Sequence, residues 1–288
     1  ALSAIVLWAS LAALGVSLSH VPPFLLTGVA LLIGSVIALP LSGWDWRQWR
    51  VPPTTLALGV YGLFGFHFLL FIALRHAPPV PANLVNYLWP LGMVVLAPWL
   101  LPGKQLTRRH LFAALLGFAG AALAIVGGRG DALEATWAWG YVPALASAFV
   151  WATYSLLTQR VAHFPTAAIG SFAAASGVLS LLCHWWLESP VHLTAQDWGL
   201  MALLGLGPLG GAFFLWDAAL KRGDARKIGL LSFITPLLST LLAVPLRATW
   251  PWLPLIVTRL PAMLPRLRTV LAMASPPSDT LRIGFGIG

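Results

Sequence analysis

The chain consists of long apolar runs separated by short segments that hold its few charges. Its 288 residues are 59% hydrophobic and 9% charged, with a mean hydropathy of +0.84. Soluble domains carry about 25% charged residues, and a transmembrane helix needs about 20 mostly apolar ones. The pattern therefore predicts an all-α integral membrane protein and excludes an ordinary soluble domain.

Nine runs are long enough to cross a bilayer. They lie near residues 2–19, 23–41, 54–74, 81–101, 109–127, 138–158, 166–187, 196–216 and 226–246. A tenth candidate within 250–275 is doubtful, because four prolines interrupt it and three arginines put charge into hydrocarbon. We expect the first run to stay in the protein, since it lacks the basic leader of a cleavable signal peptide.

Basic residues are concentrated in alternate loops. The loops that follow even-numbered spans carry ten, whereas those that follow odd-numbered spans carry only Arg75, Arg129 and Arg247. This bias predicts a multi-pass protein of a bacterial-type inner membrane with a cytoplasmic N-terminus. It also explains the formal charge of +9 without a nucleic-acid partner. The single cysteine, Cys183, offers no disulfide framework, and we expect neither a metal nor a cofactor.

An internal repeat relates the two halves of the chain. Trp8-Ala9-Ser10 reappears as Trp151-Ala152-Thr153, and Pro90-Leu91 reappears as Pro236-Leu237 at a similar offset. Each unit holds five spans, which is an odd number, so the second unit enters the membrane in the opposite sense. The sequence therefore predicts an inverted-topology repeat, which is typical of secondary transporters.

The repeat suggests a division of the chain. We expect the first five-helix repeat in residues 1–128, a linker in 129–137, the second, inverted repeat in 138–275, and a C-terminal tail in 276–288. Transporters of this kind bind substrate near the bilayer midplane, where interrupted helices of the two halves meet. Pro90 and Pro236 are a corresponding pair, and we expect them to break their helices and to take part in gating.

Several motifs resemble a known family, the drug/metabolite transporter superfamily with its EamA-type repeats. They are Asn86-Tyr87-Leu88-Trp89-Pro90, Gly207-Pro208-Leu209-Gly210, Phe214-Leu215-Trp216-Asp217, Lys221-Arg222-Gly223-Asp224-Ala225-Arg226 and Thr235-Pro236-Leu237. The resemblance implies about ten helices in two inverted five-helix repeats. The first motif is similar to that of the YddG-type exporters, which implies aromatic amino acids as substrates.

The resemblance ends near Val244. The fifth span of the first half is rich in glycine, whereas its expected partner near 253–274 has no glycine. We interpret residues 245–288 as out of register with the family, for example through a change of reading frame in the source gene.

Two predicted helices from opposite halves carry polar and aromatic stripes. The positions recur at i, i+3, i+4 and i+7, and they are Asn83, Asn86, Tyr87 and Pro90 in one helix and Trp151, Tyr154, Ser155 and Thr158 in the other. Rings with amide and hydroxyl groups suit a ligand that has a ring and a polar head. The alternative is that these groups only form hydrogen bonds from helix to helix.

His67 is the only ionisable side chain that we expect deep within the nine spans, where it can carry a proton, bind substrate, or be purely structural. The resemblance implies a central cavity lined at the positions of His67, Tyr87, Trp89 and Trp151. Asp217 lies four residues before Lys221, so the two predict an ion pair on one helix.

These features together predict an exporter of aromatic amino acids and related small metabolites that works by alternating access. Because we expect no buried carboxylate, facilitated movement is favoured over proton coupling. Alternatives are export of another small metabolite or of cationic drugs, a channel, and an intramembrane enzyme. For the last, Gly128-Arg129-Gly130-Asp131 matches a GxGD motif but lacks a second aspartate at membrane depth, so we expect no catalytic residue.

Overall fold

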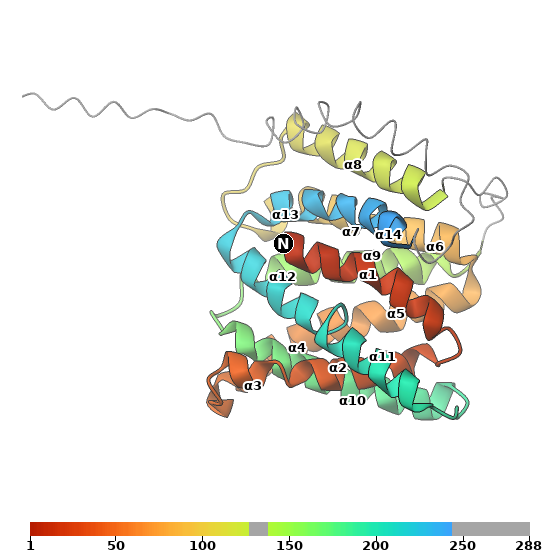
Figure 1. Ribbon diagram of the computed structural model, residues 1–288. Helices are drawn as coiled ribbons and strands as arrows, with labels where there is room; N and C mark the ends of the chain where they lie inside the picture. The colour runs from red at the N-terminus through yellow and green to blue at the C-terminus, as the bar shows by residue number, and fades with distance from the viewer. Residues whose placement is uncertain (127–137, 244–288) are drawn as a thin grey trace, which may run out of the picture. The chain divides into compact units, whose positions relative to one another are not determined.

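The computed structural model describes residues 1–126 and 138–243, and every regular element within them is a helix (Figure 1). Each of the nine predicted spans coincides with one helix or with a run of helices. By length and composition, six of these segments can cross a membrane. The predicted linker, tenth span, out-of-register segment and tail all lie outside the described residues.

The first half of the chain contains spans one to five. Its helices are α1 (Leu2–Ser17), α2 (Pro23–Ser35), α3 (Ala38–Leu41), η1 (Trp46–Trp49), α4 (Pro53–Val60), the π-helical η2 (Tyr61–Gly65), α5 (Phe66–His76), α6 (Pro79–Asn86), α7 (Trp89–Leu100) and α8 (Arg108–Val126). Span three is the continuous run α4, η2 and α5, and span four is α6 with α7.

The second half contains spans six to nine. Its helices are α9 (Tyr141–Leu157), η3 (Thr166–Ala168), α10 (Ile169–Leu187), α11 (Ala195–Leu206), α12 (Gly211–Arg222), α13 (Ala225–Leu231), η4 (Ser232–Ile234) and α14 (Thr235–Ala243). Span eight continues to Arg222, beyond the predicted end at 216, which places Asp217 and Lys221 within helix α12.

Span four is not the single helix that the polar stripe predicted. Helix α6 ends at Asn86 and α7 begins at Trp89, so Asn83 and Pro90 lie on separate helices. The cause is Pro90, which has no N–H for the carbonyl of Asn86 and whose ring clashes with that carbonyl in a regular helix. The Leu88 N–H instead bonds the Val85 carbonyl at 3.1 Å, closing a tighter turn.

A comparable irregularity interrupts span nine. There α13 gives way to the short 3₁₀ segment η4, and α14 then begins at Thr235 with Pro236 in its first turn. The two interrupted spans also touch, since a Cβ on Gly229 of α13 would lie 3.2 Å from the Cβ of Met93 in α7. Pro90 and Pro236 thus both lie in the first turn of a helix that follows an interruption.

Helices of the two halves pack against each other throughout the described part. Helix α2 packs on α10 and α11, α1 on α12 and α14, α9 on α5, α6 and α7, and α13 on α7. Several of these neighbours lie side by side in Figure 1, for example α1 and α12. The central core contains Trp89, Trp151 and Trp216, all buried.

Glycine permits the closest of these approaches. A Cβ on Gly34 of α2 would lie 2.6 Å from the Gly205 carbonyl oxygen of α11 and 2.6 Å from the Cα of Gly210. On the other face of α2, a Cβ on Gly177 of α10 would lie 2.9 Å from the Gly28 carbonyl oxygen. Small residues at such contacts are the usual means by which membrane helices pack closely.

We predict that Gly205→Ala destabilises the protein, although alanine normally favours a helix. The new methyl group would clash with the Ala30 carbonyl of α2, and overpacking of this kind costs about 1–3 kcal/mol. The control is Gly199→Ala on the same helix, where nothing lies within 4 Å of the added Cβ. Thermal unfolding in detergent measures both, and equal melting temperatures for the two variants would contradict the close packing of α2 on α11.

Candidate functional site

A cluster of aromatic rings joins helices from both halves of the chain. Trp8 of α1 contacts Trp216 of α12, with ring centroids 5.0 Å apart, and Trp151 of α9 at 5.8 Å. Trp89 of α7 lies 5.7 Å from Trp216. Phe213 packs 5.7 Å from Trp151. Most pairs meet edge to face or tilted, which aromatic quadrupoles favour. We call these five residues, together with Phe66, the aromatic cluster.

His67 lies beside this cluster on α5. Its ring is 6.2 Å from Phe213 and 5.1 Å from Phe66, and the residue is 6% exposed. The Nδ1 atom is 2.6 Å from the Leu63 carbonyl oxygen. A carbonyl only accepts hydrogen bonds, so Nδ1 carries the hydrogen and Nε2 is left as an acceptor. In the described part of the chain, no hydrogen bond to Nε2 is present.

Two hydroxyl groups of α9 form hydrogen bonds to aromatic side chains of neighbouring helices. The Trp216 Nε1–H donates to Ser155 Oγ at 3.1 Å, and both residues are buried. Thr153 Oγ1 lies 2.8 Å from the hydroxyl of Tyr61, which opens the π-helical segment η2. The ring of Tyr154 lies against Gly62 in that segment, where any Cβ would clash with it. Such π-bulges occur often at functional sites.

The structure divides the residues that the sequence predicted as a substrate site. Trp89 and Trp151 belong to the aromatic cluster, His67 contacts its phenylalanines, and Tyr154 lies 5.3 Å from Trp151. Asn86 instead accepts a hydrogen bond from Ser147 Oγ of α9 at 2.8 Å, which is a bond from helix to helix. The remaining two, Asn83 and Tyr87, are half-buried beside the break in span four.

Sequence reasoning missed four members of the cluster. Trp8 and Trp216 were noticed only as parts of a repeat and of a family motif, and neither Phe66 nor Phe213 was predicted as a site residue. The signal was present, because Trp8 corresponds to Trp151 in the repeat. If one of them lines a site at the interface of the halves, its counterpart is a candidate too.

The expectation that no carboxylate is buried was wrong. Asp197 and Asp217 are buried, and the side chain of Glu188 is 2% exposed; each carboxylate is paired with a basic side chain. Asp217 Oδ2 accepts from Lys221 Nζ at 2.6 Å, which confirms the predicted pair on one helix, and from Thr166 Oγ1 at 2.7 Å.

Glu188 joins three spans at one end of the described helices. Its carboxylate accepts from the backbone N–H groups of Phe24 and Leu25 at the start of α2, at 3.0 and 3.2 Å. Arg75 Nη2 donates to it at 2.9 Å, and His184 Nδ1 lies 2.9 Å away. A carboxylate at a helix N-terminus is favoured by the helix dipole, so this pairing compensates for burial of the charge.

A second ion pair connects the halves through Asp224, which precedes α13. Lys104 Nζ donates to Asp224 Oδ2 at 3.0 Å and Arg226 Nη2 donates at 2.7 Å. Burial alone would raise the pKa of the Asp224 carboxyl, but the hydrogen bonds from Arg226 and Lys104 hold this pKa well below its usual range. The carboxylate therefore stays ionised, and the link persists, at neutral pH.

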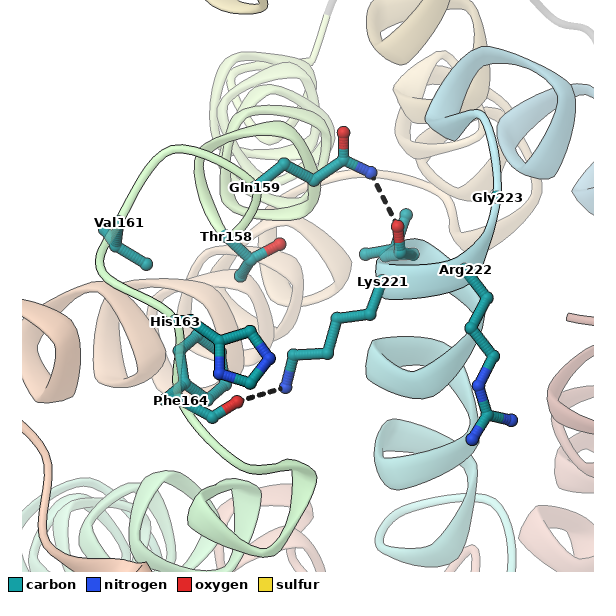
Figure 2. A pocket seen from close by; sticks show the side chains of 9 residues that line it. Thr158, Gln159, Val161, His163, Phe164, Lys221, Arg222 and Gly223 are labelled. Carbon is teal, nitrogen blue, oxygen red and sulfur yellow. Dashed lines mark hydrogen bonds between the residues drawn. The ribbon is translucent and has the colours of Figure 1, made fainter.

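A cavity of about 460 Å³ opens between the end of α9, the loop that follows it and the end of α12 (Figure 2). Its lining residues are Thr158, Gln159, Val161, His163, Phe164, Leu220, Lys221, Arg222 and Gly223. Within residues 1–126 and 138–243, no three His, Cys, Asp or Glu side chains are grouped so that they could hold a metal ion.

Comparisons with known proteins are consistent with this architecture. The model of the EamA-like transporter family matches residues 1–126 and 138–258. The chain is 42% identical over 248 residues to the aromatic amino acid exporter YddG of Ancylobacter novellus, covering 84% of this chain and 85% of that protein. It is 28% identical over 263 residues to a probable amino-acid metabolite efflux pump of Salmonella typhimurium, covering 82% of each. A crystal structure of a protein 36% identical in sequence matches 98% of this chain and 96% of its own, with a TM-score of 0.84.

We predict that Ser155→Ala destabilises the aromatic cluster. The Trp216 N–H would be left buried without its acceptor, which costs about 1–3 kcal/mol. Ser171→Ala is the control, because that half-buried hydroxyl donates only to the nearby Ala168 carbonyl. Unfolding in detergent, followed by tryptophan fluorescence, gives both values. An equal effect of the two substitutions would show that the indole hydrogen bond does not hold the cluster.

Proposed function

Because the chain belongs to the EamA-like transporter family, we propose that it exports aromatic amino acids and related small metabolites across the inner membrane. The observation that carries this proposal is the aromatic cluster, which both halves build and which His67 adjoins. The 42% identity to an aromatic amino acid exporter supports the same substrate class.

The cluster suits a ligand with a ring and a polar head. A substrate ring can replace one of the tilted indole contacts, each worth about 0.5–1.5 kcal/mol beyond the area that it buries. The Nε2 atom of His67 can accept a hydrogen bond from an ammonium or an indole N–H. We therefore assign the substrate-binding role to His67, Trp89, Trp151 and Tyr154, with Trp8 and Trp216 as additional members. Asn83, Asn86 and Tyr87 are retained as second candidates beside the break in span four.

The helix contacts support two inverted five-helix repeats. Each span of the first half has a counterpart five positions later in the second half, and the two make corresponding contacts. Span one packs on spans eight and nine, and its counterpart, span six, packs on spans three and four, which are the counterparts of eight and nine. Span two packs on its own counterpart, span seven, and span four packs on span nine. This pattern is what a pseudo-twofold axis between the halves produces, and an odd number of spans in each repeat places such an axis in the membrane plane. We assign the repeats to residues 1–128 and 138–275.

The transport cycle in this proposal is a rocking of one repeat against the other around the cluster. The buried carboxylates of the described residues are engaged in ion pairs or helix caps, so they are not free proton carriers. We therefore propose that substrate moves down its own gradient without coupling to protons. The N-terminus and the cavity of Figure 2 are then cytoplasmic, because basic residues are concentrated in the even-numbered loops.

We predict that Trp151→Ala reduces phenylalanine and tryptophan flux about tenfold or more, since about 1.4 kcal/mol of lost ring contact corresponds to that factor. Leucine flux is expected to change much less. The measurement is uptake of labelled amino acids into proteoliposomes. Trp185→Ala is the matched control, because that indole is 75% exposed on α10 and away from the cluster. Equal losses for leucine and the aromatic substrates would assign Trp151 a structural role and count against the proposed site.

A further inference from the structure

We propose that the cavity in Figure 2 binds the ammonium and carboxylate groups of an amino acid before transport, with Asp217 taking the ammonium and Lys221 the carboxylate. This rests on the proposed function and deepens it, because it names a second site with a separate chemistry. The aromatic cluster recognises the ring, whereas this cavity recognises the zwitterion.

The first argument is the position of the ion pair at the cavity, with Lys221 in the cavity wall and its partner Asp217 buried behind it. Asp217 is 3% exposed, and its carboxylate is held by Lys221 and Thr166. Lys221 lines the cavity, and its Nζ also donates to the Phe164 carbonyl at 2.8 Å. Figure 2 shows the lysine side chain extended across the cavity toward Phe164 and His163. Any ligand in the cavity therefore meets the ammonium directly, with the carboxylate behind it.

The second argument is the mixed lining of the cavity. Its volume of about 460 Å³ lies within the about 300–1,000 Å³ that is usual for small-molecule sites. Phe164, Val161 and Leu220 offer apolar surface, and the Phe164 ring already lies 3.9 Å from Lys221 Nζ. Gln159 spans the opposite wall, where its Nε2 donates to the Leu220 carbonyl at 2.8 Å. A small amphiphilic ligand fits this combination.

The third argument is charge balance. A buried ion is strongly destabilised when its partner is removed. An amino acid zwitterion carries the same two groups as the Lys221 and Asp217 side chains, so it can exchange partners with them. Its ammonium replaces Nζ at the Asp217 carboxylate, its carboxylate pairs with the released Nζ, and no charge is left alone. An amine or a carboxylic acid with one charge leaves one protein charge uncompensated, so the site excludes it.

The fourth argument is continuity with the aromatic cluster. Asp217 follows Trp216 on α12, and the Trp216 indole bonds Ser155 on α9. The carbonyl of Ser155 in turn accepts from Thr158 Oγ1 at 3.0 Å, and Thr158 lines the cavity. The same two helix segments thus form part of the cavity wall and part of the cluster, so the cavity and the cluster are neighbours along α9 and α12.

The test begins with the unmodified protein in detergent and four probes: phenylalanine, leucine, 2-phenylethylamine and 3-phenylpropionate. The readout is the ligand concentration that gives half-maximal thermal stabilisation. The proposal expects phenylalanine to act at a concentration about tenfold or more below that of either singly charged analogue, since one charge-assisted hydrogen bond is worth at least that factor. The proposal is overturned if the amine or the acid has the same half-maximal concentration as phenylalanine, or if no probe stabilises the protein.

Substitutions then identify which residues cause the preference for phenylalanine over the singly charged analogues. Asp217→Asn is expected to abolish the preference for phenylalanine over 3-phenylpropionate, and Lys221→Met the preference over 2-phenylethylamine. Arg160→Gln is the matched control, because this exposed cation follows α9 and is not among the residues that line the cavity, so it is expected to change neither preference. Preferences that survive in folded Asp217→Asn and Lys221→Met protein overturn the proposal.

A cavity-filling variant covers the case in which those two proteins do not fold. Val161→Trp adds bulk to the lining without touching the ion pair, and it is expected to raise the half-maximal concentration of phenylalanine about tenfold. Binding equal to that of the unmodified protein overturns the proposal. Leucine separates this inference from the proposed function: if leucine stabilises as well as phenylalanine while both analogues fail, the zwitterion site stands and aromatic selectivity fails.

Discussion

In the hydrocarbon core of a bilayer, backbone N–H and C=O groups must find their hydrogen-bond partners inside the protein. The described part of this chain meets that constraint with helices alone. The constraint also limits where a helix can be interrupted, because irregular backbone at membrane depth is tolerated only where protein or a polar cavity covers it. The interruptions at Pro90 and Pro236 satisfy this requirement, since both prolines are buried against neighbouring helices. The same positions are thus suited to movement without exposing backbone to lipid.

The interface of the two halves carries both the proposed substrate site and ion pairs that link the halves. Arg75 with Glu188 connects the halves at one end of the helices, and Lys104 with Asp224 connects them at the other. The aromatic cluster lies in the core between helices of both halves. In an alternating-access cycle, one set of links opens while the other holds, so the cluster is exposed to one side at a time. The zwitterion cavity belongs to the second half and requires neither set of links to break.

The sequence predicted the helices well, because hydropathy directly reports the length that a bilayer requires. It predicted the breaks less well. The residues around Tyr87 have a helical spacing of polar groups, and only the steric effect of Pro90 reveals that the helix ends before it. The π-helical turn that begins at Tyr61 has no local signature, since its glycine contact with Tyr154 comes from another helix.

The sequence predicted only part of the candidate site, because contacts between distant helices have no local signature. Trp89, Trp151 and His67 stand out in the sequence as aromatic or ionisable residues within apolar runs. Phe213 does not, because nothing along the chain distinguishes a phenylalanine that meets His67 from one that faces lipid. The burial of Asp217 was missed because its partner Thr166 lies 51 residues away, and only the tertiary structure brings the two together.

The measurement that tests the account most directly is exchange in proteoliposomes that contain this chain and are preloaded with unlabelled phenylalanine. The account predicts saturable uptake of labelled phenylalanine, faster than in empty vesicles, slower for labelled leucine, and unchanged by a pH gradient. Such acceleration requires a carrier whose site faces each side in turn. Uptake that neither saturates nor responds to preloading, or that treats leucine and phenylalanine alike, would contradict the account.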